Sequence, residues 1–335
     1  MHIQSAGRSM KRRAFCGTLA GAVVSRPLAA GAQRSKKIPV VGFIHPGGPE
    51  VGSLVIDSLR EGLREVGYVE GESITLEIRW AHGKPELLPG LIQELIQLGA
   101  DVLVPTARPS IEAARAATTT LPIVANDLES DPIASGYTTS LARPSGNLTG
   151  VFLDAPTMCR KWLQQINDVV PRVAKVGVLW DVTTGTFQLE ATRAGAKERS
   201  LNLVVMEFRD ASELETALKR GVADDPDAIM QLGSPLIRQG APLIAEMLSR
   251  HRIPAISQFR TYPDSGGLMS YGPDLAYLWR RISFQVSRVL RGARPADLPI
   301  ERPTRFELVI NMKSARTLGV TVPTVLLAAA DEVIE

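Results

Sequence analysis

The sequence has few of the residues from which catalytic and metal sites are usually built. Its 335 residues include only two cysteines and four histidines. His45, His82 and His251 are too scattered to suggest a metal-ligand set. The sequence also lacks HExxH, paired CxxC, GxSxG and the phosphate-binding GxxxxGK[ST] motif. We therefore predict no catalytic residue, no metal site, no cofactor and no enzymatic activity.

Acidic residues are absent from the first 32 positions, which carry five Lys or Arg. The whole chain has 38 basic and 35 acidic residues, but residues 33–335 alone have 33 and 35, a net charge of −2. The basic character thus belongs to the N-terminus, and the body gives no reason to expect a nucleic-acid partner. Its length fits about two domains, because single cores stop growing at ~250–300 residues.

The N-terminus has the three parts of an export signal. Residues 11–13 are basic, residues 14–24 form a short apolar stretch, and the small residues 30–32 precede a predicted cleavage before Gln33. A spanning helix needs ~20 apolar residues, so this stretch is too short to be one. Elsewhere the longest apolar runs are only strand-length. We predict a periplasmic protein that does not itself span the membrane.

Two export routes remain open from the sequence. Arg12-Arg13-Ala14-Phe15 resembles a twin-arginine signal, although Lys11 stands where that pattern prefers Ser or Thr. Cleavage would remove Cys16, leaving Cys159 as the single cysteine of the mature chain, so no intramolecular disulfide can form.

The body alternates short apolar strands with amphipathic helices, which is typical of a parallel sheet covered on both faces. Predicted strands cover 38–44, 73–80, 101–105 and 122–126, and predicted helices cover 54–66, 86–98 and 109–118. The same order recurs at offsets of 126 to 135 residues, with predicted strands at 173–180, 202–209, 227–233 and 253–257. A repeat this long indicates two related domains, since solenoid repeats run ~20–50 residues.

The C-terminal part adds elements to both domains. Strands are predicted at 266–272 and 306–311, and helices at 275–290, 312–318 and 323–333. The chain should therefore cross between the domains near 146–154, 258–271 and 294–305, where Gly, Pro and polar residues gather. We predict an α/β fold of two Rossmann-like, doubly wound lobes joined by a multi-crossover hinge. The N-terminal lobe would comprise 33–150 plus about 272–295, and the C-terminal lobe 151–271 plus about 300–335.

Ligand-binding residues are expected in the loops that follow the strands, at the cleft between the lobes. In the first lobe the candidates are His45, Thr106, Arg108, Ser110 and Asp127. The hydroxyl groups of Thr106 and Ser110, with free backbone N–H groups, could bind a carboxylate, and Arg108 could add a charged partner. The alternative is an ordinary helix start with an Arg that faces solvent.

The second lobe and the hinge supply the other candidates, which are Trp180, Asp181, Ser234, Phe259 and Tyr271. Asp181 could accept a ligand ammonium or could only cap the next helix. Trp180 could support a planar ligand or pack into the core. Phe259 and Tyr271 would reach the cleft from the crossings.

Several segments carry a resemblance to a known family. They are KRRAF (11–15), GYVEGESITLEIRWA (67–81), RPSGNLTGV (143–151), GGLMSYGP (266–273), ADLPIERPTRFELVINMKSARTLGVTVP (296–323) and ADEVIE (330–335). The chain resembles the ABC-transporter substrate-binding proteins that include tryptophan- and tyrosine-binding members, which have the type I periplasmic binding protein fold. This resemblance implies capture of a small molecule between the lobes and delivery to a membrane permease, without chemistry on the ligand.

The family resemblance also bears on the ligand. Relatives that bind aromatic amino acids are expected to hold the carboxylate with N–H and hydroxyl groups and the amine with an acid, for which Thr106 and Asp181 are the counterparts here. Arg108 stands where the family is expected to have a small residue, and its charge favours a small organic anion as the ligand. This ligand would be an aromatic or a carboxylate-bearing compound. We expect a monomer. Two alternatives to an importer component remain: a sensor protein that presents its ligand to a receptor, and an enzyme with the same fold.

Overall fold

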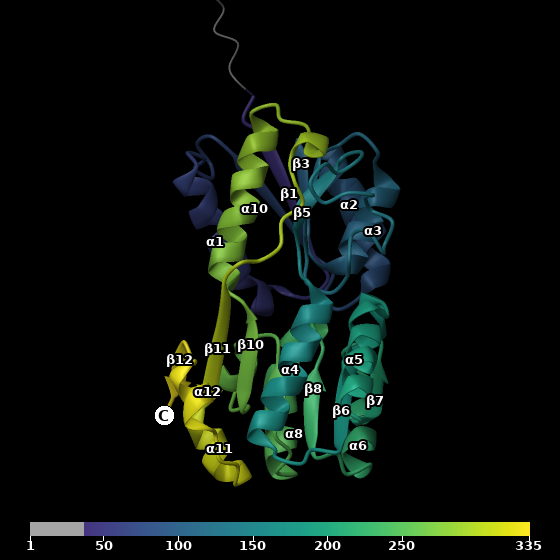
Figure 1. The fold of residues 1–335 in the computed structure, drawn as a ribbon. Helices are drawn as coiled ribbons and strands as arrows, with labels where there is room; N and C mark the ends of the chain where they lie inside the picture. The colour runs from purple at the N-terminus through teal and green to yellow at the C-terminus, as the bar shows by residue number, and fades with distance from the viewer. Residues whose placement is uncertain (1–36) are drawn as a thin grey trace, which may run out of the picture. The chain divides into compact units, whose positions relative to one another are not determined.

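The computed structural model describes residues 37–335, except for the side chains of residues 50–54 (Figure 1). The predicted export signal lies outside the described residues. Residues 38–335 form one compact unit, which contains two parallel-sheet lobes. The predicted α/β fold with two lobes is confirmed.

The first lobe is built on a five-stranded parallel sheet in the order β2-β1-β3-β4-β5. Its strands are β1 (Val40–His45), β2 (Thr75–Trp80), β3 (Val102–Pro105), β4 (Ile123–Asp127) and β5 (Leu148–Phe152). Its helices are α1 (Pro49–Glu65), α2 (Leu88–Gln97) after the short η1 (Pro85–Leu87), α3 (Ala107–Ala117) and, from the C-terminal part, α10 (Leu275–Leu290). The apolar run of β1 is buried from its second residue onward because helices cover both faces of the sheet.

Helix α10 packs beside α1 although more than 200 residues separate them (Figure 1). A Cβ at Gly62 of α1 would come within 2.6 Å of Ser283 Oγ on α10, so the two helices are in close contact. The Ser283 hydroxyl donates a hydrogen bond to the Leu59 carbonyl at 3.1 Å. The packing makes α10 part of the first lobe.

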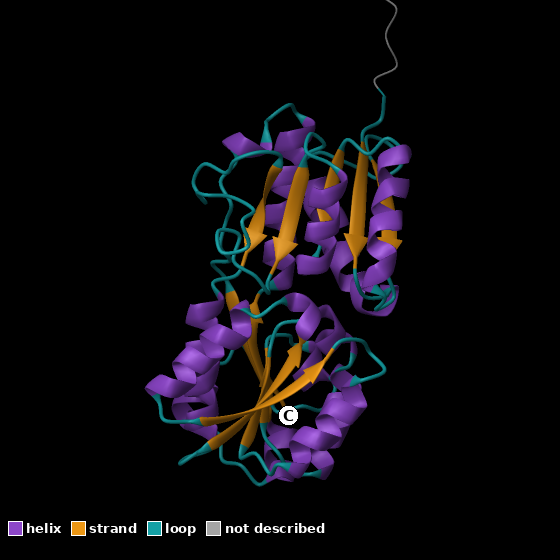
Figure 2. Ribbon diagram, turned by 90° about the vertical axis from the view of Figure 1, so that its right-hand side faces the viewer, coloured by secondary structure: helices purple, strands orange, loops and turns teal. Residues whose placement is uncertain are grey.

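The second lobe has a seven-stranded sheet in the order β12-β11-β10-β9-β8-β6-β7, which lies between helices in Figure 2. Its strands are β6 (Lys175–Asp181), β7 (Asn202–Phe208), β8 (Ala228–Gln231), β9 (Ala255–Ser257), β10 (Met269–Pro273), β11 (Phe306–Asn311) and β12 (Glu332–Ile334). Its helices are α4 (Ala155–Val169), α5 (Phe187–Glu198) after η2 (Val182–Thr184), α6 (Leu214–Ala223), α7 (Pro235–Gln239), α8 (Ala241–Arg250), α9 (Thr261–Asp264), α11 (Met312–Leu318) and α12 (Thr324–Ala328). Among the strands of the described residues, only β10 and β11 pair antiparallel, because the chain leaves for the first lobe after β10 and returns in β11.

The predicted helix over 323–333 is partly wrong. Helix α12 ends at Ala328, and β12 then pairs with β11 as the edge strand of the sheet. The side chain of Asp331 accepts a hydrogen bond from the Leu308 N–H at 2.8 Å, and its own N–H donates to the Leu308 carbonyl at 2.9 Å. These two bonds to β11 turn the chain into an extended conformation that local helix propensity does not predict.

The chain passes between the sheets three times. The first crossing lies between β5 and α4, the second between β10 and α10, and the third between η3 (Pro295–Asp297) and β11. The predicted crossing at 258–271 is wrong, because β9 and β10 are neighbours in one sheet and the chain leaves that lobe only after Pro273.

Candidate functional site

A cavity lies where the carboxyl ends of the first-lobe strands face the second lobe. Polar and aromatic side chains around it come from both lobes: His45, Thr106, Asn126, Glu129, Arg238, Phe259 and Trp279. The space that it leaves for water-sized molecules is about 20 Å³. That is room for little more than one water molecule, so a ligand would need more space than this arrangement of the lobes leaves.

Sheet topology explains why the first-lobe residues meet. His45 ends β1, Thr106 directly follows β3, and Asn126 lies near the end of β4. Thr106 and Asn126 form an isolated parallel bridge that extends the pairing of β3 and β4. Because the carboxyl ends of parallel strands share one edge of the sheet, residues far apart in sequence become neighbours there.

The second lobe contributes Arg238 through the short helix α7. Ser234 follows β8 and caps this helix, its hydroxyl oxygen accepting from the N–H groups of Leu236 at 3.0 Å and Ile237 at 3.4 Å. Pro235 occupies the first helical position, where a missing N–H costs nothing. One turn later, Arg238 is only 7% exposed.

Three buried polar atoms of the cavity residues have no hydrogen-bond partner within the part of the chain that the structure describes. They are Thr106 Oγ1, Asn126 Oδ1 and Trp279 Nε1. An unsatisfied buried group costs about 1–3 kcal/mol, and most buried polar groups in native proteins are paired. Their gathering around one cavity indicates a place for polar groups of a ligand.

Arg238 and His45 supply the charge pattern of the cavity. Burial lowers the pKa of Arg238 to about 10, so its guanidinium is still charged at neutral pH. Burial, together with the charge of Arg238, holds the pKa of His45 well below its usual value, so the imidazole is neutral. Arg238 Nη2 lies 3.4 Å from His45 Nε2, and the guanidinium lies over the Phe259 ring at 5.6 Å from its centroid.

Two buried carboxyl groups, Asp127 and Glu129, lie next to each other in the loop after β4. Burial raises the pKa of Glu129 well above its usual value, and the charge of Asp127 raises it further. Burial also raises the pKa of Asp127, although its carboxylate accepts hydrogen bonds from the N–H groups of Glu129 and Ser130, both at 2.9 Å. Burial therefore disfavours the charged form of both carboxyl groups, and that of Glu129 more strongly because Asp127 lies beside it.

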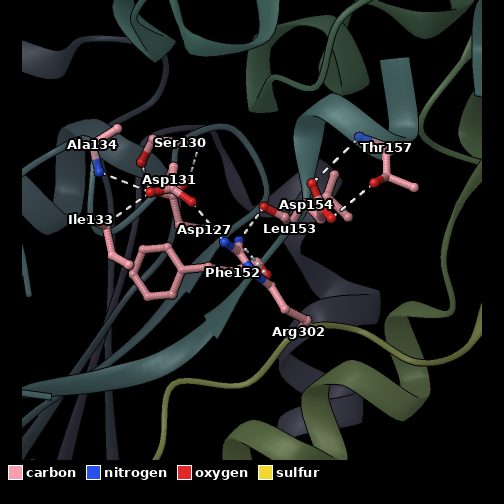
Figure 3. A network of polar contacts seen from close by, with 10 residues as sticks. All are labelled: Asp127, Ser130, Asp131, Ile133, Ala134, Phe152, Leu153, Asp154, Thr157 and Arg302. Carbon is pink, nitrogen blue, oxygen red and sulfur yellow. Dashed lines mark hydrogen bonds and ion pairs between the residues drawn. The ribbon is translucent and has the colours of Figure 1, made fainter. Parts of the chain in front are cut away.

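The same loop is tied to two of the crossings (Figure 3). Arg302, on the third crossing, forms an ion pair with Asp131 at 2.7 Å and donates to the Leu153 carbonyl of the first crossing at 2.5 Å. Asp131 also accepts from the N–H groups of Ile133 and Ala134, both at 2.9 Å. Burial raises the pKa of Asp131, but the hydrogen bonds from Ala134 and Arg302 outweigh it and hold the pKa below its usual value.

Of the residues that the sequence singles out in the first lobe, His45 and Thr106 line the cavity. Asp127 is fully buried behind it, paired with Glu129. Ser110 is buried in α3, and its hydroxyl has no partner among the described residues. Arg108 does not line this cavity, because its guanidinium binds Glu112 at 2.8 Å and lies close to Gly185.

From the second lobe, only Phe259 of the predicted residues lines the cavity. The Asp181 carboxylate accepts from the hydroxyl groups of Ser234 at 2.6 Å and Thr183 at 2.7 Å, an arrangement that suits capping better than ammonium binding. Trp180 Nε1 donates to the Gly185 carbonyl at 2.9 Å, outside the cavity. Tyr271 stacks on Phe306 at 5.7 Å, because alternate residues of a strand point to opposite faces.

Three further residues that line the cavity were not predicted from the sequence: Arg238, Glu129 and Trp279. For Arg238 a signal was present: Ser234-Pro235 after a strand marks a helix start at the cleft, and a residue one turn later shares its face. Glu129 and Trp279 gave no such signal, because their positions depend on the loop after β4 and on the packing of α10 against the first lobe.

Two α/β lobes with a cavity between them match the class of type I periplasmic binding proteins. The family of ABC transporter substrate binding proteins matches residues 38–334, and the chain belongs to this family. The family resemblance of the sequence is thus confirmed.

Individual relatives agree with this assignment. The chain is 23% identical over 271 residues to a tyrosine-binding protein of Clostridioides difficile, covering 78% of this chain and 77% of that one. A crystal structure of an ABC domain from Streptococcus pneumoniae in complex with L-Trp is similar at a TM-score of 0.81 and 25% identity, over 88% of this chain and 99% of that one. A conserved domain protein from Vibrio cholerae shares the fold at a TM-score of 0.83 and 23% identity, over 89% of this chain and 100% of that one.

Within residues 37–335, no helix is long and apolar enough to cross a membrane. The same residues contain no group of three or more His, Cys, Asp or Glu side chains placed to hold a metal ion.

Proposed function

We propose that this protein is the solute-binding component of an ABC importer, exported to the periplasm as a monomer. It captures a small organic ligand, aromatic or carboxylate-bearing, in the cavity between the lobes and delivers it to a membrane permease. The N-terminal residues 1–32 serve as its export signal. The lobes comprise 33–150 plus about 272–295 and 151–271 plus about 300–335, and they close over the ligand by bending at the crossings.

The observation that carries this proposal is a group of three polar atoms at the cavity, on Thr106, Asn126 and Trp279, which have no hydrogen-bond partner among the described residues. In a binding protein, ligand groups satisfy such atoms, so their cost in the unliganded state adds to the affinity. The relatives named for binding tyrosine or carrying L-Trp support an aromatic solute. Phe259 and Trp279 supply aromatic surface in this cavity.

A solute screen tests the proposal. The purified protein is heated with single compounds from a collection of amino acids, aromatic and aliphatic carboxylates, sugars and neutral aromatics. We expect a rise in melting temperature with a small, chemically related subset, one-to-one binding by calorimetry, and recovery of the solute unchanged after incubation. Stabilisation by no compound, or conversion of a bound compound, would refute solute binding as the function.

The importer role needs a separate measurement in cells. We expect deletion of the gene to abolish high-affinity uptake of the radiolabelled solute, and a plasmid copy to restore it. Unchanged uptake in the deletion strain would refute the transport role and favour presentation of the ligand to a receptor.

A further inference from the structure

We infer that His45 and Arg238 form a donor pair that binds a carboxylate of the ligand, and that this carboxylate links the two lobes. The inference rests on the proposed solute-binding function and specifies its substrate class and two specificity-determining residues. It follows from the position of the proton on His45, from the lack of a salt bridge between Arg238 and any described residue, and from the burial of Glu129, which disfavours its anionic form.

The hydrogen bond of Gly47 determines where His45 carries its proton. The backbone N–H of Gly47 lies 2.9 Å from His45 Nδ1, and an N–H group can only donate. Nδ1 is therefore the unprotonated nitrogen of the neutral imidazole. The single proton is on Nε2, which faces Arg238 across the cavity.

A guanidinium has five N–H donors and no acceptor. Arg238 Nη2 and His45 Nε2, which lie 3.4 Å apart, are thus two donors that cannot bond to each other. Both N–H groups are buried, and a buried donor without an acceptor is costly. An acceptor placed beside both nitrogens would satisfy them together, and an anionic acceptor would also neutralise the guanidinium.

No described residue forms a salt bridge with Arg238. Its guanidinium lies beside His45 and the Phe259 ring, and Glu129 is near enough to favour its charge. The Asp181 carboxylate already accepts from Ser234 and Thr183. Glu129 lines the cavity, but burial and the adjacent Asp127 raise its pKa well above the usual value and disfavour its anionic form. A buried cation without a paired anion is unfavourable, so the site selects a ligand that brings a negative charge.

The state of Glu129 also affects ligands that carry an ammonium group. An ammonium in this cavity would need an anionic Glu129 as its partner, and burial together with the adjacent Asp127 disfavours that form. Carboxylates without an amine avoid this cost. The favoured substrate class is therefore a small monocarboxylate, with its apolar part against Phe259 and Trp279.

The position of the two donors explains why the carboxylate would link the lobes. His45 belongs to β1 of the first sheet, and Arg238 belongs to α7 of the second lobe. Without an anion, closing the cleft brings two donors together. When a carboxylate is bound, each lobe donates a hydrogen bond to it, so the bound carboxylate favours the closed arrangement.

The test compares each carboxylate with its uncharged primary amide, for example phenylacetate with phenylacetamide and benzoate with benzamide, on the wild-type protein. The best-bound solute of the screen is included with its own amide. We expect the carboxylate to bind at least about 30-fold more tightly than the amide, because charged hydrogen bonds are lost and an NH₂ group faces two donors. The deaminated acid 3-phenylpropionate should bind more tightly than L-phenylalanine.

Variants assign the effect to the two residues. R238M should weaken carboxylate binding by about 30-fold or more and leave amide binding nearly unchanged, whereas R238K should retain part of the affinity as a point charge. H45F should weaken the carboxylate less, because it removes one neutral donor. R250M is the matched control, since Arg250 is an exposed residue of α8 that pairs with Glu246.

The outcomes separate this inference from the proposed function. If the best-bound solute lacks a carboxylate, or if R238M leaves carboxylate affinity unchanged, the inference is overturned while solute binding stands. If no solute of any class binds the wild-type protein, solute binding itself fails. The ligand comparison uses the unaltered chain, so it remains decisive even if R238M does not fold.

Discussion

Polar groups lie both in the cavity and in the crossings, but the two regions differ in whether those groups have hydrogen-bond partners within the protein. In the crossings, Thr149 Oγ1 donates to the Leu298 carbonyl at 2.9 Å, and Glu301 binds Arg281 through two contacts of 2.8 Å. In the cavity, the hydroxyl of Thr106 and the indole N–H of Trp279 have no described partner. These groups of the crossings are paired within the described chain, apart from Gln285 Oε1 next to Glu301, whereas the two groups of the cavity are not.

This difference separates stability from binding. A substitution that removes a satisfied polar group in the crossings should destabilise the protein, because a partner atom is left buried and unpaired. The removal of an unpartnered group from the cavity should cost no stability, although it should weaken ligand binding. The same chemical change can therefore have opposite effects on stability in the two regions.

The largest effect is expected at Gly150 of β5, next to the first crossing. Its φ is +145°, and a Cβ there would lie 2.0 Å from the Ala125 carbonyl oxygen. We expect G150A to lower the free energy of unfolding by about 3 kcal/mol or more, measured by urea denaturation. The control is G90A in α2, where no atom lies within 4 Å of the added Cβ and a small gain in stability is expected.

A G150A variant as stable as the wild type would show that the strands next to the crossing are not tightly packed. The contrast between the two regions would then lose its structural basis.

The second prediction concerns Arg302, which connects the third crossing to the loop that carries Asp127 and Glu129. R302M removes its ion pair with Asp131 and its hydrogen bond to the Leu153 carbonyl, and we expect a loss of about 2 kcal/mol at pH 7. The variant should also bind solute more weakly, since the loop forms part of the cavity.

The effect of R302M should depend on pH. The pKa of Asp131 is lower in the folded state than in the unfolded state, so its stabilising contribution is present above the unfolded-state pKa and is lost as the pH falls through the folded-state pKa. The difference in stability between wild type and R302M should therefore shrink in that acidic range. A difference that stays constant down to the lowest pH would contradict the assigned role of the ion pair.

Two matched substitutions, T149V and T106V, test whether hydroxyl groups of the crossings and of the cavity differ in their contribution to stability. We expect T149V to destabilise by about 1.5 kcal/mol, because the Leu298 carbonyl loses its side-chain donor and the Pro299 carbonyl loses one of two. T106V removes a hydroxyl without a described partner, so the unliganded protein should keep or gain stability while solute affinity falls. Equal destabilisation by both substitutions would show that Thr106 is satisfied without a ligand.

The smallest effect is expected at Ala107, the first residue of α3 beside the cavity. Its φ is +63°, a region that costs a residue with a Cβ roughly 1–2 kcal/mol. Part of the gain from glycine is offset by its flexibility in the unfolded chain, so A107G should stabilise by about 0.5–1 kcal/mol. A113G, within the same helix, should instead destabilise by about 1 kcal/mol.

Much of the fold could be predicted from the sequence because its strands are continuous apolar runs and its helices are amphipathic. The duplication located the lobes, and the strand ends located His45 and Thr106. The pairing of strands and helices that lie far apart in the sequence could not be predicted from these local patterns. The strand β12 and the crossing after Pro273 depend on contacts with β11 and α10, which local patterns do not encode.

Side-chain roles were harder to predict than strand ends. Arg108 and Arg238 both lie near the start of a helix that follows a strand, so the same sequence pattern marks both residues. The difference comes from local partners: Glu112 lies one turn after Arg108 and pairs with it, whereas Arg238 has no such acid and stays in the cavity. For Asp181 the sequence left ammonium binding and helix capping open, and in the structure its carboxylate accepts from the hydroxyl groups of Ser234 and Thr183.

Native mass spectrometry tests the central claim most directly, because it detects a small molecule held in the cavity without requiring its identity. The freshly purified protein, examined alone and after incubation with the solute collection, should show a second species heavier by the mass of one small organic molecule. That species should disappear on denaturation. A single unliganded species under both conditions would contradict the account.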